Sequence, residues 1–464
     1  MTACIVGAGT SGVICAKVFK QKGIAFDCFE KGSGVGGLWR FRNDNGVSSA
    51  YRSLHINTSK RMMQLSDYPF PDHMAEYPSH EEILEYFESY CAHFGVLEHI
   101  TFNTEVLHAE RLAGGGWRVR IATPDGEESR DYDHLVVANG HHWNPRSPAL
   151  PGAFSGEVMH AHYYIDVDEP VATRGKRVVV VGSGNSAMDI VCELGAAARE
   201  EGGPAKVFLS QRSGVWVIPK VMGNTPQDAA MRHPMERPGR FENFYRRYIP
   251  TPLRHYLMNR VTEQRVRSVA GDPHRFGLKK PLSDFSSRHP TVSQDIHSRL
   301  VHGDITPKGD IIECDGRAVR FEDGSSEDVD VIIQCTGYNI VFPFLDRGLI
   351  EATDNDIALF MRIYDPRYAD LAFIGLVQTL CAVMPIAELQ SHFVADAITG
   401  GYVLPSAVAM DAERLRYHQQ MKSRFTRSSS HTIQIHCNEY SHLLYREWDA
   451  GRERAALRGN GRAA

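Results

Sequence analysis

The sequence predicts an α/β protein with two Rossmann-like dinucleotide-binding domains, the second inserted in the first. Three observations lead to this prediction. A glycine-rich loop of the dinucleotide-binding type lies at residues 7–12, and another lies at residues 182–187. Each loop follows a short apolar run of the kind that forms a buried parallel strand. The chain of 464 residues is also too long for one compact core.

The composition excludes several classes of protein. Hydrophobic residues make up 42% of the chain, charged residues 23%, and the formal net charge is -5, which gives no sign of nucleic-acid binding. No residues have the spacing of a metal site or a Ser-His-Asp triad. The first expected strand begins at Ala3, which leaves no room for a signal peptide, and no apolar run approaches the roughly 18–20 residues that span a bilayer. We therefore expect a cytoplasmic protein without a transmembrane anchor.

The nine cysteines are scattered, odd in number and free of any C-x-x-C pair. A disulfide framework favours an even, clustered set in a short secreted chain. We therefore expect reduced thiols. The lack of a redox dithiol also argues against a thioredoxin-reductase-like enzyme.

The first loop lies between an expected strand at 3–6 and an expected helix at 11–21. Its glycines allow a tight turn, close approach of the backbone to a pyrophosphate, and close helix–strand packing. The helix N-terminus adds free N–H groups for phosphates. An acidic residue follows the next strand, where one binds a ribose hydroxyl. A glycine-rich turn is the alternative. The residues predicted to bind a dinucleotide here are Gly7, Ala8, Gly9, Thr10, Ser11, Gly12 and Glu30.

The second nucleotide unit begins with the β-branched run 177–181, typical of a central parallel strand. The next strand, 206–210, ends in Ser210 and is followed by Arg212. A carboxylate at this place would repel a 2′-phosphate, whereas Ser and Arg can bind it, so NADPH is predicted rather than NADH. A solvated strand-end charge is the alternative for Arg212. The predicted contacts are Gly182, Gly184, Asn185, Ser186, Ala187, Asp189, Ser210 and Arg212.

Two further elements of the first domain have clear local signals. Residues 79–94 are expected to form a helix that begins with the capping box Ser79-His-Glu-Glu82. Residues 100–133 alternate in short strands around a Pro124-Asp-Gly126 turn.

Two segments have no sequence motif of their own. An insertion at about 220–300 is rich in proline, arginine and aromatic residues, and its part from 231 to 267 holds nine arginines against three glutamates. We expect a helical cap over the site; a peripheral membrane or partner surface is the alternative. The C-terminal residues 446–464 are polar and rich in glycine, arginine and alanine, so we expect them to be mobile.

Between the two loops, Phe154, Gly156, His160 and Tyr164 form the pattern F-x-G-x-x-x-H-x-x-x-Y. Together with the loops, it resembles the fingerprint of the flavin-containing monooxygenases, over roughly residues 3–445. In that family the place of His160 is linked to domain connection and cofactor positioning, so we expect a hydrogen-bonded structural histidine.

The resemblance implies where the cofactors and domains lie. FAD would bind the first loop and be covered by a second glycine cluster that ends in Gly37, Leu38 and Trp39; a surface turn with a buried tryptophan is the alternative. NADPH would bind the second loop. The FAD domain would comprise residues 1–168 and 331–464, and the NADP domain residues 169–330.

The resemblance also implies an enzyme like N,N-dimethylaniline monooxygenase. NADPH reduces FAD, the reduced flavin takes up O2 to give a C4a-hydroperoxide, and an oxygen atom passes to a soft nucleophilic nitrogen or sulfur of a small amine or sulfide. Asn57, followed by Thr58, would contact both flavin and nicotinamide nucleotide and is the catalytic residue we predict. A turn-capping asparagine is the alternative.

Other activities remain open. A Baeyer–Villiger or N-hydroxylating monooxygenase is one alternative, although Tyr164 stands where Baeyer–Villiger enzymes usually have tryptophan. An uncoupled NADPH oxidase or a flavin-binding sensor is another. No motif encodes the physiological substrate, and a homodimer is left open.

Overall fold

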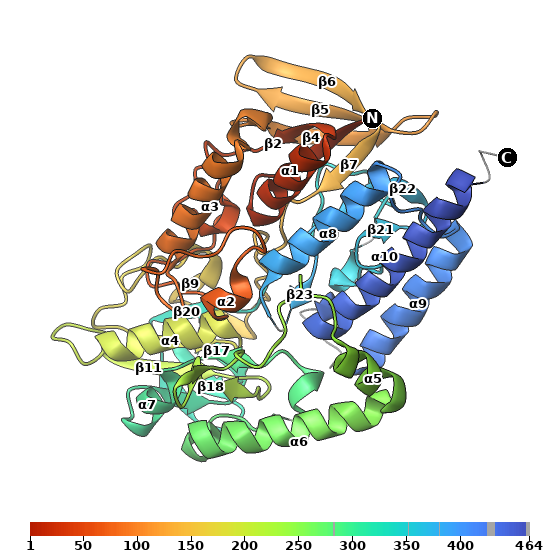
Figure 1. The fold of residues 1–464 in the computed structure, drawn as a ribbon. Coiled ribbons are helices and arrows are strands. Elements are labelled where there is room, and N and C mark those ends of the chain that lie inside the picture. The colour runs from red at the N-terminus through yellow and green to blue at the C-terminus, as the bar shows by residue number, and fades with distance from the viewer. Residues whose placement is uncertain (282–283, 351, 380, 425–431, 461–464) are drawn as a thin grey trace.

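The computed structural model describes residues 1–281, 284–350, 352–379, 381–424 and 432–460, and it contains two large sheets (Figure 1). The first sheet is parallel except at its β21 edge. Its strands, in spatial order, are β21 (Tyr364–Asp365), β22 (Tyr368–Phe373), β7 (His134–Val137), β1 (Thr2–Val6), β2 (Ala25–Phe29) and β3 (Ile100–Thr101). The strand order confirms the first Rossmann-like unit.

Helices α1 (Thr10–Lys22) and α8 (Val383–Ile398) pack together on this sheet, next to α3 (His80–Phe94). The predicted capping box of α3 is confirmed, because the Ser79 hydroxyl accepts from the Glu82 N–H and the Glu82 carboxylate accepts from the Ser79 N–H. The short strands predicted within residues 100–133 are also confirmed, and they form an antiparallel sheet. Its strands are β4 (Glu105–Arg111), β5 (Trp117–Thr123) and β6 (Gly126–Tyr132).

The second large sheet is parallel and has α4 (Asn185–Ala197) and α7 (Ile296–Val301) packed against it. Its strands, in spatial order, are β16 (Thr306–Lys308), β11 (Lys206–Ser210), β10 (Arg177–Val181), β20 (Val331–Gln334) and β9 (Glu157–His160). Strands β9 and β20 lie in this sheet, although the expected boundaries at 168 and 330 assign them to the first domain. Beside it lies a small sheet of β8 (Gly152–Phe154), β17 (Ile311–Gly316), β18 (Ala318–Phe321) and β19 (Ser326–Asp328).

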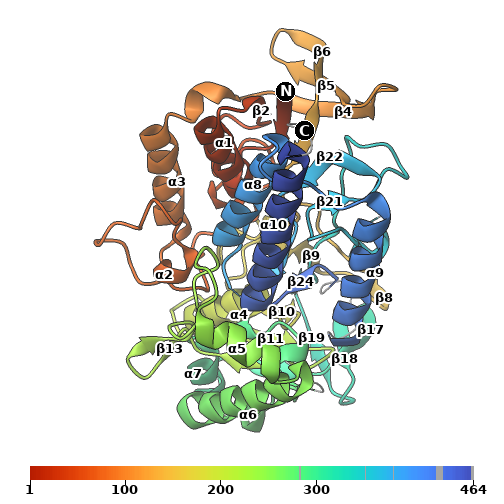
Figure 2. The same cartoon turned by 45° about the vertical axis from the view of Figure 1, so that its right-hand side comes forward.

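The insertion contains α5 (Arg240–Tyr248) and the long helix α6 (Thr251–Ala270), which lie at one end of the molecule (Figures 1 and 2). It is tied to the first domain: the Ser59 N–H donates to Asp228 Oδ2 at 2.8 Å, and Arg61 donates to the carbonyl oxygen of Met231 at 2.9 Å. Its short strands are β12 (Val217–Ile218) paired with β15 (Thr291–Val292), and β13 (Val221–Met222) paired with β14 (Thr225–Pro226).

The C-terminal segment corrects one expectation. Residues 446–460, predicted to be mobile, belong to α10 (Cys437–Asn460), which runs beside α8 and α9 (Ala407–Arg424) (Figures 1 and 2). Trp448 is buried and donates to Asp396 Oδ2 at 2.9 Å, and Arg452 donates to the same oxygen at 2.8 Å. Composition misses this order because the contacts that fix the helix come from α8.

The cysteines correct a second expectation from the sequence. Cys381 and Cys437 form a disulfide, although reduced thiols were predicted. Strands β23 (Gln378–Thr379) and β24 (Gln434–Ile435) pair in parallel directly before the two cysteines and bring them together. The spacing of the cysteines along the chain carries no sign of this pairing. In the described part of the chain, no helix is long and apolar enough to cross a membrane.

Candidate active site

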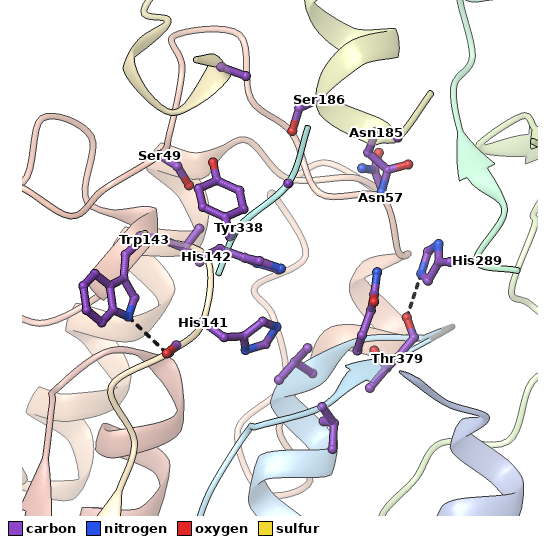
Figure 3. Close-up of a pocket in the computed structure, with 18 of the residues that line it drawn as sticks. Ser49, Asn57, His141, His142, Trp143, Asn185, Ser186, His289, Tyr338 and Thr379 are labelled. Carbon is purple, nitrogen blue, oxygen red and sulfur yellow. Dashed lines mark hydrogen bonds between the residues drawn. The ribbon is translucent and has the colours of Figure 1, made fainter. Parts of the chain in front are cut away.

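Both glycine-rich loops open into one cavity of about 1380 Å³. One loop follows β1 and the other follows β10, so the cavity lies at the carboxyl ends of parallel strands, where open α/β sheets bind ligands. Met258, Val261 and Thr262 of α6 line it from the insertion, as the cap interpretation expects. Figure 3 shows polar side chains from both domains around this space.

The first loop has the geometry of a phosphate-binding turn. Gly7 has φ 97°, and a Cβ there would lie 3.0 Å from the carbonyl oxygen of Ala138. A Cβ on Gly12 would lie 1.8 Å from the carbonyl oxygen of Gly7, so only glycine lets α1 approach β1 this closely. Helix α1 begins after Gly9 without a side-chain cap, which leaves its first N–H groups available to an anion.

Glu30 is buried at the end of β2 and lines the cavity. Its Oε2 accepts from the N–H of Ala8 at 2.8 Å, and its Oε1 accepts from the N–H of Gly32 at 2.9 Å and from Asn45 Nδ2 at 3.1 Å. These contacts hold the carboxylate in place and leave lone pairs for the hydroxyls of a ribose.

Asn57 lies in the cavity lining with Thr58. Its Oδ1 is buried and has no hydrogen-bond partner among the described residues, so no turn-capping contact accounts for it. A buried polar atom without a partner costs about 1–3 kcal/mol, which a ligand that pairs with it would recover. Figure 3 draws Asn57 on the same side of the cavity as Asn185 of the second loop.

The second loop repeats the backbone features of the first. Gly182 has φ 145°, and a Cβ there would lie 2.6 Å from the carbonyl oxygen of Cys335. A Cβ placed on Gly184 would have no other described residue within 4 Å, apart from its own chain neighbours. The space beside this glycine leaves room for a pyrophosphate. Helix α4 begins after Gly184 without a side-chain cap. This loop therefore offers a second anion site.

Two guanidinium groups lie near the second loop. Arg212 lines the cavity, and Arg288 of the insertion lines it as well. Arg288 donates to Ser213 Oγ at 2.8 Å and to Ser183 Oγ at 3.3 Å. Burial and the nearby charge of Arg212 lower the pKa of Arg288. Ser210, by contrast, is buried outside the lining and donates to the carbonyl oxygen of Gly309 at 2.8 Å.

Asp189 joins the two domains rather than facing the cavity. Its Oδ2 accepts from the Tyr51 hydroxyl at 2.5 Å, and Tyr51 belongs to the first domain. Burial raises the pKa of Asp189 to about 6, against the effect of this hydrogen bond.

Residues 154–164 connect the two loops, and hydrogen bonds hold the histidine of this segment, His160, in one tautomer. His160 Nδ1 accepts from the N–H of His162 at 3.0 Å, so Nε2 carries the proton and donates to the carbonyl oxygen of Gly337 at 3.1 Å. Burial lowers the pKa of His160 to about 4. Tyr164 is fully buried and packs edge-on against Tyr51, with ring centroids 6.3 Å apart. His160 is thus the hydrogen-bonded structural histidine that was expected.

The cavity lining brings together most of the residues predicted to bind cofactors. These are Gly7, Gly9, Thr10, Ser11, Glu30, Gly37, Leu38, Trp39, Asn57, Thr58, Gly182, Gly184, Asn185, Ser186, Ala187 and Arg212. Four predicted residues lie outside the lining: Ala8, Gly12, Asp189 and Ser210. The individual contacts to FAD and NADPH stay predictions.

The sequence analysis missed Arg288 and His289. His289 Nε2 lies 2.8 Å from the carbonyl oxygen of Thr379 and so links the insertion to β23, as Figure 3 shows. Both residues stand in a stretch without a motif, and a proline after the pair is the only local signal. Among the described residues, no group of three or more His, Cys, Asp or Glu side chains could hold a metal ion.

The residues present fit two dinucleotides. Each loop offers a turn and an uncapped helix N-terminus, one with a buried acid beside it and the other with two arginines. Comparison with known proteins agrees: the family model of flavin-binding monooxygenase-like proteins matches residues 2–447. The chain belongs to this family.

Among relatives of this flavin monooxygenase, flavin-containing monooxygenase 5 of Rattus norvegicus is 35% identical over 445 residues, which cover 93% of this chain and 79% of the relative. Dimethylaniline monooxygenase (N-oxide-forming) 2 of the same species is 33% identical over 450 residues, covering 94% and 80%. The predicted family and the assignment as an FAD- and NADPH-dependent monooxygenase are confirmed.

Solved structures show the same fold. S-allyl-L-cysteine S-oxygenase from Allium sativum matches with a TM-score of 0.70 and 25% identity, covering 97% of this chain and 88% of that one. The open structure of cyclohexanone monooxygenase matches with a TM-score of 0.68 and 17% identity, covering 97% and 98%. The predicted two-domain α/β fold is thereby confirmed.

Proposed function

We propose that this flavin monooxygenase transfers one oxygen atom from O2 to a soft nucleophilic nitrogen or sulfur atom of a small amine or sulfide, with NADPH as reductant. In the overall reaction, NADPH, O2, a proton and the substrate give NADP⁺, water and an N-oxide or S-oxide. FAD, when bound, supplies the hydride and oxygen chemistry, while the protein positions the reactants and excludes water.

The observation that carries this proposal is the unpartnered amide oxygen of Asn57 in a cavity shared by both nucleotide loops. An amide can donate to one ligand and accept from another without adding a charge or a competing base. This property suits a residue between a flavin and a nicotinamide.

The side chains around Asn57 do not by themselves separate heteroatoms from ketones as substrates. The amides, hydroxyls and imidazoles that Figure 3 draws around the cavity could donate to the oxygen of a ketone under attack. The preference for heteroatoms therefore rests on the relatives. The relatives named as dimethylaniline monooxygenase and S-allyl-L-cysteine S-oxygenase support the same class of substrate.

The basic pair favours NADPH over NADH. Arg212 and Arg288 both line the cavity near the second loop. Two guanidinium groups that repel one another gain from a bound dianion, such as a 2′-phosphate. The cytoplasmic location and the homodimer stay predictions.

The test is the coupling of NADPH oxidation to product. FAD-loaded enzyme is given NADPH and O2 with methyl p-tolyl sulfide, N,N-dimethylaniline or cyclohexanone, and NADPH consumed, product and hydrogen peroxide are all measured. We expect sulfoxide and N-oxide to account for most of the NADPH and the lactone for little. NADPH converted entirely to peroxide would make the protein an oxidase, and efficient lactone formation would make it a Baeyer–Villiger enzyme.

Substitution of Asn57 sharpens this test. We expect Asn57→Leu to lower the rate of product formation about a hundredfold while FAD stays bound, because the amide positions the reactants. NADPH that is still consumed should then appear as peroxide. The control is Asn243→Leu, which removes an exposed amide on α5. Equal coupling in both variants would remove Asn57 from the reaction.

A further inference from the structure

The segment from Gln434 to Asn438 brings polar side chains into the apolar side of the cavity. Strand β24 pairs with β23, with Thr379 opposite Ile435, and the disulfide joins Cys381 to Cys437 just beyond. His436 and Asn438 flank that disulfide and line the cavity. The segment is thus fixed at two adjacent points to the same wall that carries Thr379.

His436 and Asn438 have unused hydrogen-bonding capacity. His436 Nδ1 and Asn438 Oδ1 are both buried and have no hydrogen-bond partner among the described residues. Buried polar groups in proteins are nearly always paired, and leaving one unpaired costs about 1–3 kcal/mol. Two such side chains together, in the lining of a cavity, indicate a ligand that pairs with them.

The neighbouring charges are already satisfied. The Glu439 carboxylate accepts from His255 at 2.7 Å and from Arg424 at 2.5 Å, and these partners hold its pKa far below its usual range despite burial. Burial lowers the pKa of His436 to about 4, so its imidazole is neutral at pH 7. The free groups of this segment that line the cavity are therefore an uncharged imidazole and an amide; the unpartnered amide of Gln434 lies outside the lining.

Apolar side chains of neighbouring elements line the same cavity. The hydrogen bond between His255 and Glu439 fixes α6 against the start of α10, and Met258, one turn further along α6, lines the cavity. Met384 of α8 lines it from the other domain. The cavity therefore offers thioethers as well as the polar groups of His436 and Asn438 to a substrate.

We propose that His436 and Asn438 form a subsite that hydrogen-bonds an uncharged hydroxyl or amide substituent of the substrate, remote from the oxygenated atom. An amide offers a donor and an acceptor, and a neutral imidazole offers one of each, so the pair suits a group that both donates and accepts. This proposal rests on the proposed oxygenation of small amines and sulfides, whose nitrogen or sulfur atom would lie toward Asn57.

The experiment compares two sulfides that differ only in this substituent, 4-(methylthio)benzyl alcohol and its apolar isostere 4-ethylthioanisole. Their kcat/KM values and their dissociation constants from the oxidised, FAD-loaded enzyme are measured for wild type, Asn438→Ala and His436→Phe. We expect each variant to lower the alcohol-to-ethyl preference about fivefold to tenfold, because one hydrogen bond to the substrate is lost. His436→Gln, which retains a donor and an acceptor, should restore most of it.

The alcohol-to-ethyl preference is a ratio measured within one variant, so it does not change if that variant is partly unfolded or has lost part of its FAD. The matched control Gln420→Ala removes an exposed amide on α9, away from the cavity lining, and should leave the preference unchanged. A preference that is the same in wild type, Asn438→Ala and His436→Phe would overturn the subsite. If the wild type consumes NADPH but oxygenates neither sulfide, the proposed function fails, and the two dissociation constants still decide the subsite.

Discussion

The two glycine-rich loops share a backbone but differ in the side chains beside them. In both, the first glycine has a positive φ, 97° at Gly7 and 145° at Gly182. Each glycine lies against the residue that follows the neighbouring strand of its sheet, Ala138 after β7 and Cys335 after β20. In both, the following helix starts without a side-chain cap. The backbone therefore makes two equivalent phosphate sites.

The side chain after the second strand separates the two sites. After β2 it is Glu30, a buried acid held by two N–H groups and an amide. After β11 it is Arg212, which Arg288 joins from the insertion. An acid accepts from a free ribose, and a pair of guanidinium groups binds a phosphorylated one. The two sites thus differ in the side chains that follow the second strand and in Arg288, and not in the loops themselves.

The largest expected effect comes from the last position of each loop, which is Gly12 in the first loop and Ala187 in the second. Gly12→Ala would place a Cβ 1.8 Å from a backbone oxygen, whereas the second loop already carries the buried Ala187 at the corresponding position. Overpacking costs about 1–3 kcal/mol or more, so we expect FAD affinity to fall about tenfold to a hundredfold. The ratio of flavin to protein absorbance after purification measures this loss.

Ala187→Gly is the matched change in the second loop. It creates no clash and costs only about 1 kcal/mol of helix stability, so the KM for NADPH should change little. Full FAD in Gly12→Ala would show that α1 can move away from β1, and a loss of NADPH use in Ala187→Gly would show that the second site needs the Ala187 methyl group.

The next effect concerns the basic pair. Arg212→Glu should raise the KM for NADPH about a hundredfold, because it removes a charge-assisted hydrogen bond and adds repulsion of the 2′-phosphate. Arg288→Ala should raise it about tenfold. Steady-state kinetics with NADPH and NADH make the measurement, and the values for NADH should stay nearly constant. Arg174→Ala, which breaks a surface pair with Asp168, is the control.

Local patterns in the sequence predict the loops and the caps but not the contacts between distant segments. The glycine spacing at residues 7–12 and the Ser79 capping box are set within a few residues, so both can be read from the chain. Arg288 meets Arg212 only because the insertion folds back over the second loop. The disulfide between Cys381 and Cys437 depends in the same way on the pairing of β23 with β24.

Composition failed at the C-terminus for a related reason. Residues 446–460 look polar along the chain, yet Trp448 and Arg452 both bind Asp396 of α8. A helix whose order comes from a buried carboxylate on another element leaves no local signal. The subsite at His436 and Asn438 is equally invisible in the sequence, because it needs both the disulfide and the strand pair.

An effect on stability rather than on catalysis is expected at Asp189, the residue of the second loop unit that contacts the other domain instead of the cavity. Its pKa rises from 3.8 to about 6 in the folded protein, so the folded state binds the proton more tightly than the unfolded state does. The contribution of Asp189 to stability is therefore full below about pH 4 and is lost as pH rises through about 6. Asp189→Asn, which can still accept from Tyr51, should raise the free energy of unfolding near pH 7.5 by about 3 kcal/mol and change it little near pH 4.

Asp304→Asn, in the same domain, should change the free energy of unfolding in the opposite direction. Burial raises the pKa of Asp304, but the hydrogen bonds from Arg199 and Arg299 outweigh it and lower the pKa overall. This variant should therefore lose stability near pH 7.5 and approach wild type as pH falls below about 4. Urea unfolding of FAD-loaded protein across this pH range measures both variants. A neutral-pH loss of stability in Asp189→Asn would show that the ionised carboxylate, and not the neutral acid, holds Tyr51 and the two domains together.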